Sequence, residues 1–357
     1  MSELIKIPGM LDPHTHLRDL DWSHKATFAS ETAAALAGGY TAVFDMPNTA
    51  PSTISQDTLV QKLAKIDAAA YCDYGLYFGA SQADNTTEYA KIVQSVCGLK
   101  MFCNDTTGDL LIENQADRDK HIAAWSDSKM IAVHAEGETV PEILALVRKY
   151  RKRTHFLHIS TAQEIDYLRD AKEEGLPVTI GVCPHHLYLI ADDVNTLGAY
   201  ALMKPELKTS TDRDVLWQAL SDGVVDVVES DHAPHTIAEK ESDNPPFGIP
   251  GLETTLPLML TAVHEGRLSL ERVIDLIAVN PRKIWGLTMP DDSYALVDLD
   301  AEYTIKRENL HSQSGWSPFE GMMVRGKVRE TWIRGTKVFA DGEILVQPGF
   351  GKNLFGT

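Results

Sequence analysis

The sequence predicts an α/β fold, a TIM-type (β/α)8 barrel with a small β-subdomain formed by the N- and C-terminal segments. Between about residues 10 and 280, short β-like runs alternate with helix-like stretches in eight fairly evenly spaced units. Gly39, Gly98 and Gly175 fall where a helix should stop and the next strand begin. After about residue 290 the pattern changes to short strands, with a hairpin turn at Asp341-Gly342.

Each barrel unit pairs an apolar, β-like run with a helix-like stretch. The expected strands are 10–14, 41–46, 74–79, 99–103, 131–134, 154–158, 178–182 and 224–230, and the expected helices are 28–37, 59–70, 89–96, 116–125, 140–151, 162–174 and 212–222. A doubly wound open sheet is the rival arrangement, but even spacing favours closure, and no Gly-x-Gly-x-x-Gly or Walker-type loop is present. We therefore expect a barrel over residues 8–290 and a β-subdomain over residues 1–7 plus 291–357, with strands at 4–7, 294–299, 327–333, 336–340 and 343–346.

Composition and charge narrow the class of protein. The 357 residues are 43% hydrophobic, which is enough to bury a large core. A formal charge of −18 argues against nucleic acid or an anionic membrane as the main partner. No apolar run is long enough to span a bilayer, and the N-terminus does not resemble a secretory signal. Four cysteines without a Cys-x-x-Cys pair favour a reducing cytoplasm.

The residues that carry chemistry follow the predicted strands. His14-Thr15-His16 ends the first strand, and alternation places both imidazoles on the same face. Alone, this pair is weak evidence for a metal. However, His134 and His158 end the fifth and sixth strands, and Asp231 follows the eighth. Because the carboxyl ends of barrel strands open onto one face, this set predicts a catalytic, zinc-like metal site without thiolate ligands.

Lys100, in the fourth strand, admits two interpretations. A lysine in a barrel strand is ordinarily protonated and salt-bridged or reaching toward solvent, and by itself that interpretation is the better one. Beside two metal cations an ammonium group is unfavourable, unless the amine reacts with carbon dioxide. The resulting carbamate is an anionic ligand that can bridge two metals.

Several motifs together resemble one family. They are His14-Thr15-His16-Leu17-Arg18, Met46-Pro47-Asn48-Thr49, Gly98-Leu99-Lys100, Val133-His134-Ala135-Glu136, Pro184-His185-His186-Leu187, Asp231-His232-Ala233-Pro234-His235, Pro250-Gly251-Leu252-Glu253-Thr254 and Trp316-Ser317-Pro318-Phe319-Glu320-Gly321. In this combination the chain resembles the dihydroorotase family of the amidohydrolase superfamily over nearly its whole length. The branch found in the fused animal pyrimidine-synthesis proteins looks most similar.

The resemblance implies two Zn²⁺ per chain. His14, His16 and Asp231 would hold one ion, His134 and His158 the other, and carboxylated Lys100 would bridge them together with a hydroxide. Asp231 would act as general base and then as general acid. The implied reaction is the reversible cyclisation of N-carbamoyl-L-aspartate to dihydroorotate in pyrimidine biosynthesis.

Substrate recognition can be assigned on the same basis. Dihydroorotate carries a carboxylate, which Arg18 suits, while Asn48 would add a hydrogen bond and His235 would contact the ring or carboxylate. Two alternatives stay open: Arg18 pairs with Asp19 or Asp21, or Asn48 is a turn residue after Pro47. His185, His186 and His232 are expected to be supporting or structural histidines.

The chain departs from the family pattern at several positions. Lys204 stands where relatives place an arginine, so it either binds the carboxylate differently or has a surface role. Gly181 and Leu157 replace a Glu and a Cys, which argues against a third metal at those positions. The family has a mobile loop after the carboxylated lysine, here residues 104–109, with Thr106 as the expected substrate contact.

Three other functions compete with this interpretation. A hydantoinase or allantoinase would use the same metals, but Arg18 with Asn48 favours a carboxylated ring. A catalytically silent relative that acts as a structural partner of aspartate carbamoyltransferase should have lost metal ligands, whereas all six proposed positions are present. A plain metal-binding or sugar-binding barrel has no need of Asp231. The resemblance leads us to expect a homodimer and leaves open an association with aspartate carbamoyltransferase.

Overall fold

The computed structural model describes residues 4–356 and contains the predicted barrel. Its eight strands are parallel and hydrogen-bonded in sequence order. They are β2 (Met10–Thr15), β3 (Tyr40–Asp45), β4 (Asp73–Gly79), β5 (Gly98–Phe102), β6 (Met130–His134), β7 (Thr154–Phe156), β8 (Val178–Val182) and β9 (Val227–Val228). The ring closes beyond β9, where Thr15 bridges to His232 and the His16 amide donates to the His232 carbonyl at 2.7 Å.

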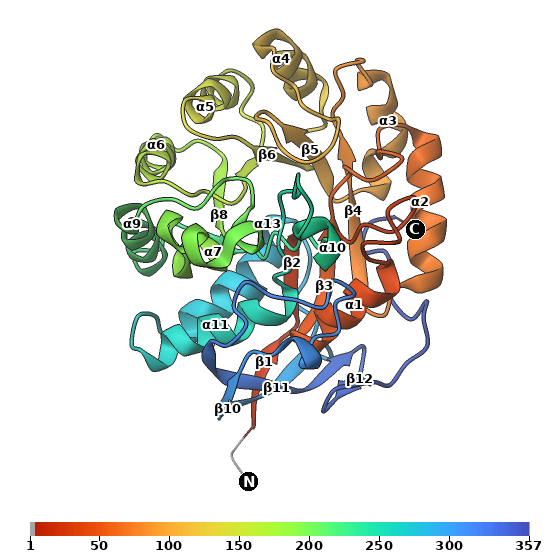
Figure 1. Ribbon diagram of the computed structural model, residues 1–357. Helices are drawn as coiled ribbons and strands as arrows, with labels where there is room; N and C mark the ends of the chain where they lie inside the picture. The colour runs from red at the N-terminus through yellow and green to blue at the C-terminus, as the bar shows by residue number, and fades with distance from the viewer. Residues whose placement is uncertain (1–3, 357) are drawn as a thin grey trace.

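Helices surround the strands, as Figure 1 shows in a view into the barrel. The predicted helices are present as α1 (Phe28–Ala37), α2 (Gln56–Ala69), α3 (Tyr89–Ile92) between two 3₁₀ turns, α4 (Gln115–Ala124), α5 (Thr139–Tyr150), α6 (Ala162–Glu173) and α9 (Ser210–Ser221). Capping boxes begin α1, α2, α6 and α9, since a Ser or Thr at each N-cap accepts from the amide three residues later. The alternation in the sequence is therefore confirmed as strand and helix.

Two strands of the barrel are shorter than expected, as is β13 (Glu343–Ile344) of the second sheet, which was expected at 343–346. The strand expected at 224–230 is paired only at Val227–Val228. Val224 and Val225 both donate to the carbonyl of Ala219, so the end of α9 takes their amides. The strand expected at 154–158 ends at Phe156, because His158 adopts a φ of +38° and leaves the extended conformation.

Further helices that the pattern did not indicate lie between β8 and β9 and after β9. They are α7 (Pro184–Tyr188), α8 (Val194–Leu197), α10 (Ile237–Lys240), α11 (Leu252–His264), α12 (Leu270–Ile274) and α13 (Asn280–Ile284), with a π-helical turn at Asp275–Val279. The longest of them, α11, is buried on nearly all sides and contains Pro257. A helix without a polar face has no 3.6-residue alternation to reveal it.

A second, antiparallel sheet lies beside the barrel, at the lower edge of Figure 1. Its order is β1 (Leu4–Pro8), β10 (Tyr294–Thr304), β11 (Met323–Ile333), β12 (Thr336–Ala340) and β13 (Glu343–Ile344). The expected subdomain strands are thus present, although β10 and β11 extend further than expected. Residues 1–3 and 357 of the expected subdomain lie outside the described residues.

The C-terminal segment returns to the amino end of the barrel. Tyr74 donates its amide to the Lys352 carbonyl at 2.9 Å, and Leu354 donates to Tyr74 at 2.8 Å. Phe355 packs against Phe44, with 5.4 Å between ring centroids. The boundary of the β-subdomain at residue 291 stays a prediction. Among the described residues, no helix combines the length and apolar character that crossing a membrane requires.

Candidate metal centre

The residues predicted as metal ligands converge at the carboxyl ends of the strands. His14 lies in β2 and His16 directly after it, Lys100 lies in β5, and His134 is the last residue of β6. His158 and Asp231 follow β7 and β9. All six side chains are buried, which excludes bulk water from the region between them.

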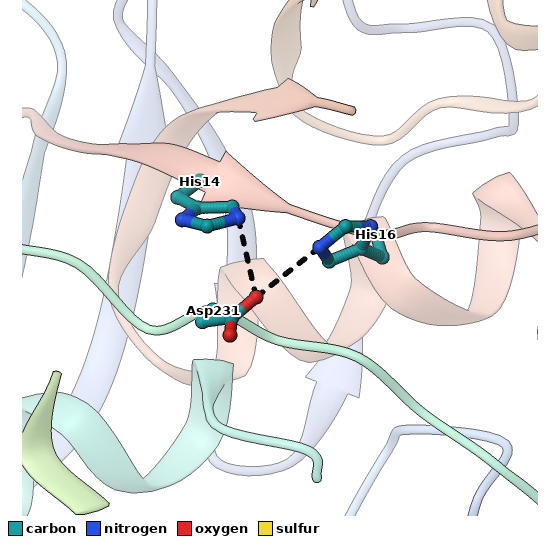
Figure 2. Close-up of side chains that lie close together, drawn as sticks. All are labelled: His14, His16 and Asp231. Carbon is teal, nitrogen blue, oxygen red and sulfur yellow. Dashed lines mark ion pairs between the residues drawn. The ribbon is translucent and has the colours of Figure 1, made fainter. Parts of the chain in front are cut away.

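The best-defined group is His14, His16 and Asp231, drawn in Figure 2. The Nε2 atoms of both imidazoles lie 3.2 Å from Oδ1 of Asp231. One ligand atom from each residue falls within 4.8 Å of the others, a spacing that a single ion can bridge. Two imidazoles and a carboxylate are ligands that zinc and similar ions accept.

A row of imidazoles continues from this group. The ring centroids of His14 and His158 are 5.2 Å apart, and those of His158 and His134 are 4.5 Å apart. Nδ1 of His158 and Nζ of Lys100 are buried without a hydrogen-bond partner, whereas Nδ1 of His14 lies 3.7 Å from Oε1 of Glu229. Buried polar atoms are normally satisfied, so the nitrogens of His158 and Lys100 fit a centre built to hold metal ions.

Burial disfavours the charged form of these side chains. It lowers the pKa of His14 to about 4 and holds the pKa of His158 well below its usual value, so both rings are neutral lone-pair donors. Burial also lowers the pKa of Lys100 to about 7, although Asp231 and Glu229 act to raise it. A neutral amine is the form that reacts with carbon dioxide.

Two buried carboxylates that we did not predict support the centre. Asp12 accepts the amide of His14 at 3.0 Å and that of Ser230 at 3.2 Å, which joins β2 to the segment after β9. Glu229 accepts the amide of His158 at 2.7 Å and lies 3.2 Å from His155 Nε2. Burial raises the pKa of Glu229, but the neighbouring histidines outweigh it and hold the pKa at about 2.

A sequence signal for both carboxylates existed. Asp12 lies two residues before His14, and Glu229 lies two residues before Asp231. In extended chain, positions two apart share a face, so each carboxylate should point the same way as the ligand that follows it.

The predicted substrate residues surround a small cavity of about 20 Å³ next to His16 and Asp231. Its lining includes Arg18, Asn48, Thr106 and Lys204. The loop at residues 104–109 covers the cavity, because Thr107 Oγ1 donates to the Phe247 carbonyl at 3.2 Å. His235 does not line the cavity but contacts Arg18 from behind.

Arg18 is buried, and its Nη2 lies 3.1 Å from His235 Nε2. Burial lowers its pKa to about 10, so the guanidinium stays charged at neutral pH. Within residues 4–356, no carboxylate forms an ion pair with it; Asp19 instead accepts the amides of Leu20 and Phe28. A buried cation without a counter-ion is prepared for an anionic ligand.

Asn48 and Lys204 have protein partners. Asn48 Oδ1 lies 2.9 Å from His16 Nδ1, and its Nδ2 donates to the Thr107 carbonyl at 2.9 Å. Because Asn48 Oδ1 contacts Nδ1 of His16, the other ring nitrogen, Nε2, faces Asp231. Lys204 pairs with Glu206 at 2.8 Å and lies 4.8 Å from the centroid of the Phe247 ring. Their roles toward substrate stay predictions.

The supporting histidines differ in their contacts. His232 Nε2 lies 2.7 Å from Glu31, and His186 Nε2 lies 3.0 Å from the Pro205 carbonyl. His185 Nε2 is buried without a partner. Burial, with Arg18 and Lys25 nearby, holds the pKa of His235 well below its usual value, so this ring is neutral.

Comparisons with known proteins agree with this architecture. The model of the amidohydrolase family matches residues 5–290. The chain is 44% identical to the multifunctional protein CAD of Squalus acanthias over 99% of its own length, but it spans only 16% of that protein. It is 35% identical to a dihydroorotase of Pyrococcus furiosus, covering 96% of this chain and 83% of that one. Among solved structures, an L-hydantoinase from Arthrobacter aurescens superimposes with a TM-score of 0.93 at 27% identity, covering 99% and 89% of the two chains.

Proposed function

The chain belongs to the amidohydrolase family and, within it, to the dihydroorotases, and from this premise we propose that it interconverts N-carbamoyl-L-aspartate and dihydroorotate. The observation that carries the proposal is the convergence of His14, His16 and Asp231 beside a buried, unpaired Arg18. The two histidines and Asp231 suit a metal that activates water, and Arg18 suits the carboxylate of the substrate.

We assign two Zn²⁺ to the centre. His14, His16 and Asp231 would hold one ion, and His134 and His158 the other. Lys100, as a carbamate, would bridge them. When bound, the two ions supply polarisation of the scissile carbonyl and a lowered pKa for a water between them. The buried nitrogens of His158 and Lys100, which have no hydrogen-bond partner, support this assignment.

Asp231 handles the proton. Its Oδ1 faces both imidazoles, and Oδ2 takes the proton from the attacking water. The water oxygen forms a bond to the ring carbonyl carbon, and the bond between that carbon and the ring nitrogen breaks. Asp231 then returns the proton to the leaving nitrogen. The reverse sequence closes the ring.

The cations of the pocket select the substrate. Arg18 binds the carboxylate, aided by Asn48, Thr106 and Lys204. The Pro234 carbonyl accepts from Arg18 Nε at 3.2 Å, and His235 lies against the guanidinium. In a chain with a formal charge of −18, this local positive charge is needed to attract an anion.

A hydantoinase is the second candidate, because an L-hydantoinase has a closely similar fold. A neutral hydantoin ring offers no anion to Arg18, so the unpaired guanidinium favours dihydroorotate. A silent scaffold is the third candidate, since an inactive dihydroorotase-like domain from Chaetomium thermophilum shares the fold with a TM-score of 0.83. A scaffold has no use for six converging ligand positions.

The proposal includes a cytoplasmic location, which the four buried, unpaired cysteines support. It also includes a homodimer and an association with aspartate carbamoyltransferase. The similarity to a multifunctional protein supports a link to other activities of pyrimidine synthesis and does not bear on the homodimer.

Turnover of dihydroorotate and hydantoin by zinc-loaded protein, followed at the amide absorbance, tests the function. Activity on dihydroorotate alone supports it, whereas activity only on hydantoin or on neither substrate overturns it. Asp231→Ala should retain most of the zinc and lose turnover, and Lys100→Ala should lose zinc. Retained turnover in Asp231→Ala would remove that residue from its role.

A further inference from the structure

Lys240, the last residue of α10, is a buried lysine with an unusual set of partners. Only 1% of it is exposed, and its Nζ donates to the carbonyls of Leu202, Pro246 and Gly248 at 3.2, 2.9 and 3.1 Å. An ammonium group has three N–H bonds, and each has one acceptor here. In the part of the chain that the structure describes, no carboxylate forms an ion pair with it.

The three carbonyls belong to two walls of the substrate pocket. Leu202 precedes Lys204 by two residues, and Gly248 follows Phe247. Lys204, Phe247 and Gly248 all line the cavity. The two walls also meet directly, because the Gly248 amide donates to Leu202 at 2.9 Å. Lys240 therefore anchors both walls from behind without touching the cavity.

The second wall in turn supports His235. The Phe247 carbonyl lies 2.9 Å from His235 Nε2. Gly248 has a φ of +132°, and a Cβ there would lie 3.0 Å from the same nitrogen and 2.7 Å from the Ala233 carbonyl. Because His235 contacts Arg18 at 3.1 Å, a shift of this wall reaches the guanidinium.

Trp316 completes the support. Its Nε1 donates to the His235 carbonyl at 2.7 Å, and its ring centroid lies 5.5 Å from Lys240 Nζ. The ammonium group and the indole thus hold the two ends of the segment that presents His235 to Arg18.

We propose that Lys240 is a positioning residue that fixes the pocket walls and so sets the affinity for the carboxylated substrate. This inference rests on the proposed function. Charge-assisted hydrogen bonds are stronger than neutral ones. Their loss leaves the Pro246 and Gly248 carbonyls without a donor and the Leu202 carbonyl with the Gly248 amide alone. Burial lowers the pKa of Lys240 to about 7. The three carbonyl acceptors favour the ammonium form, because only that form has three N–H bonds to donate.

Lys240→Met tests the proposal, because methionine keeps an apolar stem and removes all three donors. The variant should raise KM for dihydroorotate at least about tenfold, while kcat and zinc content change less than about threefold. Lys91→Met is the control, since Lys91 is an exposed lysine on α3. An unchanged KM, or an equal loss in kcat and zinc, would overturn the proposal.

A second readout does not depend on the activity. Glu241 follows Lys240 in an exposed loop, so cleavage there by a glutamate-specific protease reports how firmly the loop is held. Cleavage should be at least about tenfold faster in Lys240→Met, and a wild-type rate counts against the proposal. If the wild type fails to turn over dihydroorotate, the proposed function fails while this assay still decides the role of Lys240.

If the Lys240→Met protein does not fold, Gly248→Ala tests the same proposal. The added Cβ displaces the same wall from the pocket side. It should likewise raise KM far more than it lowers kcat, and a wild-type KM would show that the wall does not set affinity.

Discussion

Removal of the Glu229 carboxylate should destabilise the metal-free protein. The side chain is fully buried and accepts from the His158 amide at 2.7 Å, and it lies 3.2 Å from His155 Nε2. Glu229→Ala leaves two buried donors without an acceptor. Each unsatisfied donor costs about 1–3 kcal/mol, and breaking a buried pair typically costs about 3–5 kcal/mol. We therefore expect a loss of about 3–5 kcal/mol.

The assay is urea unfolding of metal-free protein, because bound metal would add its own stabilisation. Glu308→Ala is the matched control, since Glu308 is exposed and its ion pair with Lys306 at 3.7 Å is worth less than about 1 kcal/mol. A Glu229→Ala protein within about 1 kcal/mol of this control would refute the reasoning.

Gly181→Ala perturbs the same carboxylate without removing it. A Cβ at residue 181 would lie 2.3 Å from Glu229 Oε1, so either the carboxylate or β8 must move. Such overpacking costs about 1–3 kcal/mol. A variant as stable as the wild type would show that the carboxylate moves freely and does not fix His158.

Three further predictions concern the metal centre and the second sheet. Zinc removal by a chelator should lower Tm in calorimetry, because a ligand at a hundred times its Kd adds about 2.7 kcal/mol, and an unchanged Tm would contradict the metal assignment. Asn48→Leu removes the partner of His16 Nδ1 and should weaken zinc binding about tenfold or more in a competition titration; wild-type affinity would assign Asn48 to the substrate alone. The hydrogen bond to Glu253 raises the pKa of His311, so its stabilisation is present below about pH 6.5 and is lost as pH rises through the folded pKa. The stability difference between wild type and His311→Leu, from urea unfolding, should therefore shrink from about pH 5.5 to about pH 9, and a constant difference would contradict this.

Local patterns predicted most of the barrel and the candidate ligand positions. Strand runs and cap residues lie within a few positions of one another, so alternation and capping reveal them without knowledge of the rest of the chain. The strands at 178–182 and the helix at 28–37 were predicted with the bounds that the structure has. His14, His16, His134, His158 and Asp231 were placed at one site because a parallel barrel brings all strand ends to one face, and the family resemblance assigned three of them to one ion.

The sequence by itself determined the fold class, the alternation of strands and helices, and which residue types stand at the strand ends. Only the tertiary structure decided which distant groups meet: Glu229 with His158, and Lys240 with the carbonyls of Leu202 and Gly248. These contacts depend on barrel closure and on the space beside Gly181, neither of which leaves a periodic trace in the chain. A buried polar group is specified by its partners, and those partners come together only when the whole ring has closed.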